Sequence, residues 1–287
     1  MKFSNSSIRH LLEINAAMLF ISTSGALGRY IQLSVPLLIA ARAVLAFLIL
    51  FIYCKWRGFS LKVSKKDVLP IILSGILLGL HWLTYFYALK LSNVAIGMLS
   101  LFTYPILTSF LEPIVLKTKF ERVHLFLGLL VLTGIYFLVP SFDAKNSYTI
   151  AVGIGVLSAL FYAMRNLILK NRVGNYNGSM LMCFQMAIIG IFLSPFFFTN
   201  EFSELESQWP SILVLALLTT AIGHTLFLNS FKHFSVTTAS ILSSVQPIYG
   251  ILIGMVFLWE IPSLWTVLGG FFILSSVVIE SVRSYEK

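Results

Sequence analysis

Ionisable side chains inside long apolar runs are the residues of this sequence that could do chemistry. Arg42 and Arg165 each stand within such a run, and His81 and His224 stand near the middle of two others. Ionisable groups inside a bilayer are costly and are therefore candidates for function. An arginine there could hold a substrate carboxylate with its planar fork of N–H donors. A histidine could contact substrate or exchange protons near neutral pH.

Each of these residues also has a structural interpretation. Arg42 could bond backbone carbonyls at a helix break or extend towards the membrane surface. Arg165 lies about one turn from the end of its run, beside Asn166, where the surface is within reach. His81 and His224 could be neutral side chains hydrogen-bonded to a neighbouring helix.

Three further candidates lie near these residues. Trp82 and Tyr85 follow His81 and could form an aromatic wall of a cavity, although membrane aromatics commonly pack or anchor at the interface. Glu112 could exchange protons, pair with Arg165 or reach interface water.

Two matched prolines mark a different kind of candidate. Tyr104 precedes Pro105 and Gln246 precedes Pro247, where freed backbone groups can line a cavity. The predicted substrate-binding residues are Arg42, His81, Trp82, Tyr85, Tyr104, Arg165, His224 and Gln246. The proton-coupling candidates are His81, His224 and Glu112.

Motifs for soluble chemistry are missing from the sequence. It contains no GxxxxGK[ST] stretch for a nucleotide and no HExxH for zinc. Cys54 and Cys183 have neither zinc nor redox spacing, so we interpret both as small apolar fillers. We therefore expect no enzyme, no metal and no cofactor.

Composition places the chain in a membrane. It is 58% hydrophobic and 11% charged, with a mean hydropathy of +0.91, whereas soluble domains carry about 25% charged residues. The net charge of +9 is spread over short clusters between apolar runs. Membrane orientation explains such clusters better than nucleic-acid binding does.

Ten apolar runs are long enough to cross a bilayer of about 30 Å. They predict an all-α integral membrane protein with ten transmembrane helices. The runs are 11–30, 33–53, 68–88, 94–116, 123–139, 150–169, 180–198, 212–231, 236–258 and 264–282. The first run, preceded by Lys2 and Arg9, also has some features of a cleaved signal peptide.

Lysines and arginines in the loops predict the orientation. With the N-terminus inside the cell, the inside segments hold fifteen of these residues and the outside segments hold three, namely Arg29, Lys90 and Lys145. Positive loops stay inside, so both termini are predicted to be cytoplasmic, in a cell (inner) membrane.

The two halves of the chain repeat one plan. An offset of 143 aligns His81 with His224 and Arg42 with Gln185, and an offset of 142 aligns Pro105 with Pro247. This predicts repeats over residues 11–139 and 150–282. Five helices per repeat is an odd number, so the halves cross the membrane in opposite senses. Inverted repeats of this kind typify transporters with a site near the midplane, where the paired histidines would face one cavity.

The order and spacing of these motifs resemble the drug/metabolite transporter superfamily, in the family with two EamA domains. The first half carries PLLIAARAVLAFLIL at 36–50 and HWLTYFYALKLSNVAIGMLSLFTYP at 81–105; the second carries NSFKHFSVTTASILSSVQP at 229–247 and then FLWE. The resemblance implies ten helices, a central substrate cavity and transport of amino acids, other metabolites or drugs, mostly outward. One departure is that Glu260 of the second half corresponds to Thr118, with Glu121 nearby, in the first.

These observations predict a secondary transporter that exports small metabolites such as amino acids by alternating access through a central cavity. Its expected partners are a small-molecule substrate and the lipid bilayer, without nucleic acid. The alternatives are a membrane-embedded enzyme acting on a lipid-linked substrate, or a structural or sensory protein without transport. The short, acid-poor loops offer little for such an enzyme.

Overall fold

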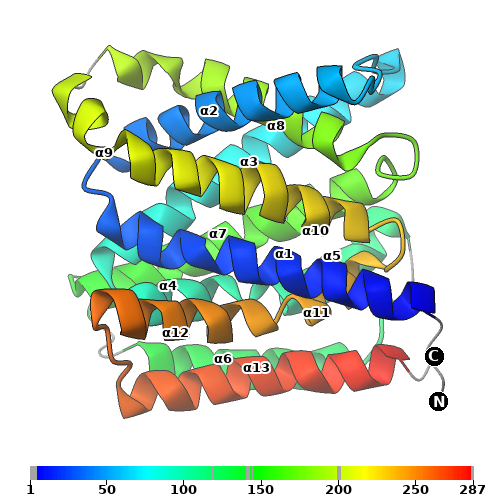
Figure 1. Cartoon of the computed structure of the whole chain (residues 1–287). Helices are drawn as coiled ribbons and strands as arrows, with labels where there is room; N and C mark the ends of the chain where they lie inside the picture. Colours follow the sequence, from blue (N-terminus) through cyan, green and yellow to red (C-terminus); the bar gives the residue numbers. More distant parts are fainter. Residues whose placement is uncertain (1–4, 118, 140–142, 144, 199–201, 286–287) are drawn as a thin grey trace.

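Long apolar helices make up most of the part of the chain that the structure describes. The computed structural model describes residues 5–117, 119–139, 143, 145–198 and 202–285 (Figure 1). Its regular structure over these residues is helical, without a strand. In lipid each segment must satisfy its own backbone hydrogen bonds, which helices do. The prediction of an all-α fold is confirmed.

The first half contains three unbroken long helices, a broken fourth and a shorter fifth. They are α1 (Asn5–Tyr30), α2 (Val35–Trp56), α3 (Lys65–Leu91), α4 (Val94–Leu101) with α5 (Tyr104–Leu116), and α6 (Val123–Leu138). Local sequence sets the starts of these helices. Pro36 occupies the first turn of α2, where a missing N–H costs nothing. The Asn93 side chain caps α4 by accepting the Ile96 N–H at 2.9 Å.

The second half follows the same order with more irregular helices. They are α7 (Ser147–Lys170), α8 (Gly178–Leu193), the 3-10 turn η1 (Ser194–Phe197), α9 (Phe202–Val214), η2 (Leu215–His224), α10 (Thr225–Ser230), α11 (Val236–Leu242), α12 (Val245–Leu258) and α13 (Leu264–Tyr285). The segment η2 is a π-helix of ten residues. Such wide turns are rare and occur frequently at functional sites.

Eight segments are long and apolar enough to cross a membrane. The helix α6 and the apolar part of α13, Leu264–Ile279, are shorter. At 1.5 Å per residue, the 16 residues of α6 extend only about 24 Å. The predicted number of ten spans therefore stays a prediction, although helices occur at all ten predicted runs.

Both halves break their fourth span at the matched prolines. In the first half α4 ends at Leu101 and α5 begins at Tyr104, just before Pro105. In the second half α11 and α12 are separated at Ser243 and Ser244. Proline cannot donate to the carbonyl four residues earlier, so the helical ladder is interrupted there. Side-chain hydroxyls at these breaks bind nearby carbonyls, as Thr103 Oγ1 does to Ser100 O at 2.9 Å.

Most close helix pairs join one half of the chain to the other. The helix α3 packs against α7, α2 against α8, and α1 against η2 and α12. The pair α6 and α13 lies along one side of the molecule, at the bottom of Figure 1. The start of α1 and the end of α13 lie at the same end of the bundle, on the right of Figure 1. Residues at the interface between the halves are therefore the ones that can line a site in the centre of the molecule.

A salt bridge ties α1 and α12 to α4 at one end of the bundle. Arg29 Nε lies 2.9 Å from Glu260 Oε1, and Glu260 Oε2 accepts the Val94 N–H at 2.7 Å. Arg29 Nη1 also donates to the carbonyls of Leu89 and Lys90, at 3.2 Å each. Glu260 thus acts as a structural link that also caps α4.

The opposite end is held by different contacts. Lys170 Nζ donates to the carbonyls of Phe231 and Phe234, at 2.8 Å each, and closes the end of α10 onto α7. The rings of His10 and His233 stack with their centroids 3.6 Å apart. Burial, and then the neighbouring His10, lower the pKa of His233, which lies between α10 and α11.

Candidate functional site

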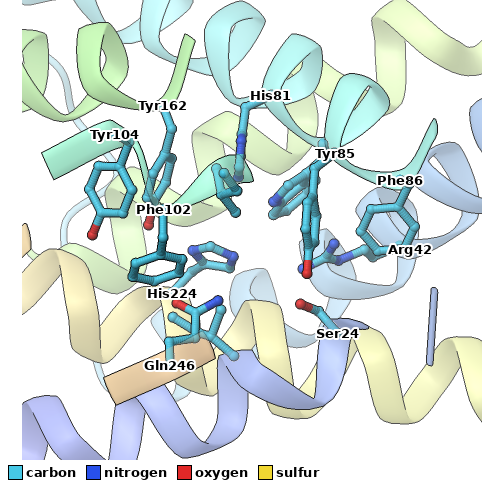
Figure 2. Close-up of a pocket in the computed structure, with 13 residues that line it drawn as sticks. Ser24, Arg42, His81, Tyr85, Phe86, Phe102, Tyr104, Tyr162, His224 and Gln246 are labelled. Atoms are coloured by element: carbon cyan, nitrogen blue, oxygen red, sulfur yellow. The ribbon is translucent and has the colours of Figure 1, made fainter. Parts of the chain in front are cut away.

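A small central pocket lies where the two halves meet. Its lining residues come from both halves and from both broken spans (Figure 2). They are Ile21, Ser24, Arg42, His81, Trp82, Tyr85, Phe86, Leu101, Phe102, Tyr104, Tyr162, His224 and Gln246. We call this space the central pocket.

The central pocket is closed to both sides of the bundle. Every lining side chain is buried, and Gln246, with 7% of its surface exposed, is the most accessible of them. The space within reach of a water centre is about 10 Å³, which is about the room that one water molecule needs. The central pocket in this arrangement of the helices is therefore too small to hold a metabolite.

Arg42 is held by neutral partners from the opposite half. Its Nε donates to Thr220 Oγ1 and its Nη2 to Thr219 Oγ1, each at 2.7 Å. The guanidinium carbon lies 3.7 Å above the ring of Trp82, a cation–π contact. Among the described residues, Nη1 has no hydrogen-bond partner. The side chain is fully buried, so the structure contradicts the interpretation that it extends to the membrane surface.

The wide turn of η2 explains how adjacent threonines reach one arginine. Thr219 and Thr220 both lie within this π-helix. A π-turn contains more residues than an α-turn, so neighbouring side chains point in more similar directions. The Thr219 hydroxyl also donates to Leu215 O at 2.6 Å, which orients its lone pairs towards Arg42. The irregular helix thus builds a fixed seat for the guanidinium.

His81 is bonded across the interface between the halves. Its Nδ1 lies 2.8 Å from Ser158 Oγ, and that hydroxyl donates to the His81 carbonyl at 2.8 Å. Because the hydroxyl proton is used there, we assign the ring proton to Nδ1. The ring stacks on Tyr162 at 4.4 Å between centroids. Ser158 and Tyr162 lie in α7, so His81 does not bond only to its own half.

His224 also lies beside Tyr162. Its ring is 6.3 Å from Tyr162, edge to face, and 5.5 Å from Trp82. Its Nδ1 is buried without a hydrogen-bond partner on the described residues. The symmetric histidines thus line one pocket, as the repeat predicts, but they make different contacts.

The two broken spans each bring a polar side chain to the pocket. The Tyr104 hydroxyl forms a short hydrogen bond with Ser243 Oγ, and so joins α5 to the break between α11 and α12. The Gln246 side chain lines the pocket, while its backbone carbonyl accepts the Ser22 hydroxyl at 3.1 Å. These bonds tie each break to the other half or to α1.

Seven of the eight predicted binding residues line the central pocket. They are Arg42, His81, Trp82, Tyr85, Tyr104, His224 and Gln246. Arg165 is fully buried, which contradicts the alternative that it reaches the surface. It lies behind Tyr162, with its guanidinium carbon 6.0 Å from that ring. Glu112 is not part of the lining. Its half-buried carboxylate lies near enough to Lys170, at the end of α7, to attract the lysine ammonium electrostatically.

Sequence reasoning missed six lining residues, among them Ser24, Phe86 and Tyr162. Phe86 follows Trp82 by four positions and therefore lies on the same helix face. Tyr162 precedes Arg165 by three positions, which is the same kind of signal. Ser24 belongs to a small-residue stretch that carries no periodic pattern. Among the described residues, no group of three or more His, Cys, Asp or Glu could hold a metal.

The fold is that of a solved structure, described only as a crystal structure of a protein. The two share 18% identity with a TM-score of 0.72, over 96% of this chain and 99% of the other. Two relatives have names that state a function. The pseudopaline exporter CntI of Pseudomonas aeruginosa is 21% identical over 80% of each chain. The threonine/homoserine exporter RhtA of Escherichia coli is 24% identical over 78% of this chain and 74% of its own.

A family model covers both halves of the sequence. The model described as the EamA-like transporter family matches residues 11–139 and 149–282. These ranges include every residue that lines the central pocket. The chain therefore belongs to the EamA-like transporter family.

Proposed function

We propose that this protein is a secondary transporter that exports small metabolites such as amino acids through the central pocket. The observation that carries this proposal is a closed, polar pocket lined by both halves of a two-part membrane fold. In alternating access, such a pocket opens to one side when the halves rock one way and to the other side when they rock back. Two relatives bear the names of exporters, one of amino acids, which supports the direction and the substrate class.

The proposal includes ten spans in two inverted halves. The helix α6 would be the fifth span of the first half, and α13 the fifth span of the second half. These two helices pack on each other. The broken spans α4–α5 and α11–α12 occupy equivalent places in the halves, near residues 102–103 and 243–244. Irregular backbone at membrane depth is tolerated where it lines a cavity, and both breaks adjoin the central pocket.

The proposal also places both termini in the cytoplasm, in the inner membrane of a bacterial cell. We expect a cysteine introduced at Glu206 to react with a membrane-impermeant thiol reagent from outside, and one at Lys65 to stay unreactive in intact cells. Both positions are exposed, and the natural Cys54 and Cys183 are buried and give little background. Labelling at position 65 and protection at position 206 would show that the orientation in the membrane is the reverse of the one proposed.

Counterflow in liposomes tests transport directly. Purified protein is reconstituted in vesicles loaded with unlabelled amino acids, and entry of each labelled amino acid is followed. We expect saturable counterflow for at least one member of the panel, because a transporter exchanges its substrate across the membrane. Vesicles that contain a Gly155→Leu variant serve as the control, since a Cβ at 155 would collide with Ser100 at the α4–α7 contact. If wild-type vesicles match empty vesicles for every compound, the proposed function is wrong.

A further inference from the structure

Two positive charges lie in the interior of this protein, and no buried acid of the described residues lies beside them. Arg42 and Arg165 both have fully buried side chains. Among the described residues, the one buried carboxylate is Asp67, in the first turn of α3. Asp67 accepts the Tyr176 hydroxyl at 2.8 Å and lies 3.6 Å from Arg172. Within the part of the chain that the structure describes, Arg42 and Arg165 therefore have no anionic partner.

The contacts of Arg165 show the same pattern as those of Arg42. Its four hydrogen bonds all go to neutral acceptors: Gln185 Oε1 at 3.1 and 2.8 Å, Asn166 Oδ1 at 3.0 Å and Met182 Sδ at 3.3 Å. Arginine stays protonated in proteins, so these neutral contacts orient the guanidinium without offsetting its charge. A buried charge without a counterion is strongly unfavourable, and a bound anion would relieve it.

Unused hydrogen-bond donors accompany both arginines. Arg42 Nη1 and Gln185 Nε2 are buried and have no partner on the described residues. Since the amide oxygen of Gln185 accepts from Arg165, its amide nitrogen is the free group, and this can only donate. A ligand that satisfies them must supply acceptors. A carboxylate has two acceptor oxygens and no donor.

The two arginines lie at different depths along one route. Arg42 is about two turns from the start of α2, and Arg165 about one and a half turns from the end of α7. Successive spans alternate in direction, so these two helix ends face opposite sides of the membrane. The central pocket lies between the arginines: Arg42 lines it, and Arg165 is separated from it by the ring of Tyr162.

We propose that this path selects organic carboxylates, and that it recognises the acidic group but not an amino group. The carboxylate binds Arg42 Nη1 at one side of the pocket and is within reach of Arg165 when the other side opens. Six aromatic rings of the lining contact the apolar body: Trp82, Tyr85, Phe86, Phe102, Tyr104 and Tyr162. No described lining residue is an acid that could pair with a substrate ammonium. This inference rests on the proposed transport function and narrows its substrate class.

A charge series tests the selectivity in wild-type proteoliposomes. The carbon skeletons of phenylalanine, leucine and threonine are each tried as the amino acid, the deaminated acid, the amine without its carboxylate, and the amino acid amide. We expect saturable counterflow for the amino acid and the deaminated acid of a transported skeleton. The amine and the amide should be weaker by at least about tenfold, because they lose a charge-assisted hydrogen bond to a buried arginine.

Two substitutions, one within α2 and one at its C-cap, connect the selectivity to Arg42. Arg42→Gln should make the acid and the amide of one skeleton compete within about threefold of each other, because the neutral side chain no longer favours an anion. Arg57→Gln removes the same charge from the exposed end of α2 and should leave the acid preference unchanged. If Arg42→Gln gives no folded protein, the wild-type series still decides the question.

The possible outcomes separate this inference from the proposed function. Carboxylate selection is wrong if an amine or amide is transported as well as its acid. It is also wrong if a deaminated acid is not transported where the amino acid is. In both cases the proposed transport function still holds. The absence of saturable counterflow for every compound, here and in the amino-acid panel, overturns both. If the wild type prefers the acid and Arg42→Gln keeps that preference, Arg42 does not select the carboxylate, and the assignment of carboxylate binding to Arg42 is wrong.

Discussion

Replacing Arg42 with lysine is expected to lower carboxylate counterflow by at least about tenfold, with little loss of folded protein. Lysine keeps the charge but replaces the planar fork with one flexible ammonium. In the structure the fork does three things at once: it donates to Thr219 and Thr220, lies on the ring of Trp82, and leaves Nη1 without a hydrogen-bond partner among the described residues. A lysine cannot maintain all of these contacts. Initial counterflow rate, normalised to monodisperse protein, measures the effect.

Arg42→Gln should have a larger effect than Arg42→Lys, because it removes the charge as well. The loss of a buried charged partner is worth about 2–5 kcal/mol, or roughly 30- to 5,000-fold in binding. Arg57→Lys and Arg57→Gln provide matched controls at the exposed end of the same helix. Should folded yield and transport fall in parallel for both Arg42 variants, the residue would be structural rather than a binding group.

Replacing Gly134 with valine is expected to separate α6 from α13. A Cβ atom at 134 would lie 2.6 Å from Ile273 Cγ1 and 2.8 Å from the backbone oxygen of Gly269. Because a backbone oxygen cannot turn aside as a side chain does, the two helices would have to move apart. Small residues permit close helix approach in membranes, where packing is a main source of association. We expect destabilisation by about 1–3 kcal/mol or more, seen as a lower Tm in detergent.

Gly153→Val is the matched control for that substitution. Gly153 also lies inside a helix, in α7, but a Cβ there would meet nothing within 4 Å. Both variants put a β-branched residue in place of a helical glycine, so they differ chiefly in helix contact. Equal unfolding temperatures for the two variants would show that α6 and α13 do not depend on this close approach.

The sequence predicted which polar residues lie in the interior better than it predicted their partners. The cost of an ionisable group in lipid singled out Arg42, His81 and His224, and all three line the central pocket. The matched prolines, singled out because proline frees backbone groups, lie beside the two helix breaks, which the uninterrupted apolar runs did not predict. In each case the signal is a departure from an apolar run, and such a departure is visible without knowing the neighbours.

Contacts between helices could not be predicted from the sequence. Lipid and protein interior are both apolar, so a helix such as α2 is apolar on all sides and does not reveal its buried face. The bonds from Arg42 to Thr219 and Thr220 span more than 170 residues and depend on the π-helix η2. The repeat aligned Gln185 with Arg42, whereas the structure makes Gln185 the partner of Arg165.

The high apolar content of α2 has a consequence for biosynthesis. Before any tertiary contact exists, this helix must partition from the translocon into lipid with Arg42 near its middle. An arginine there opposes insertion by about 2.5–3.5 kcal/mol, and each Leu, Ile, Val or Phe favours it by about 0.3–0.6 kcal/mol. The twelve such residues of α2 together supply roughly 4–7 kcal/mol, in keeping with its mean hydropathy of 2.6, the highest of the eight spans. Exposed apolar residues such as Leu48 and Ile52 must therefore stay apolar so that α2 can insert despite Arg42, although they lie outside the lining of the central pocket.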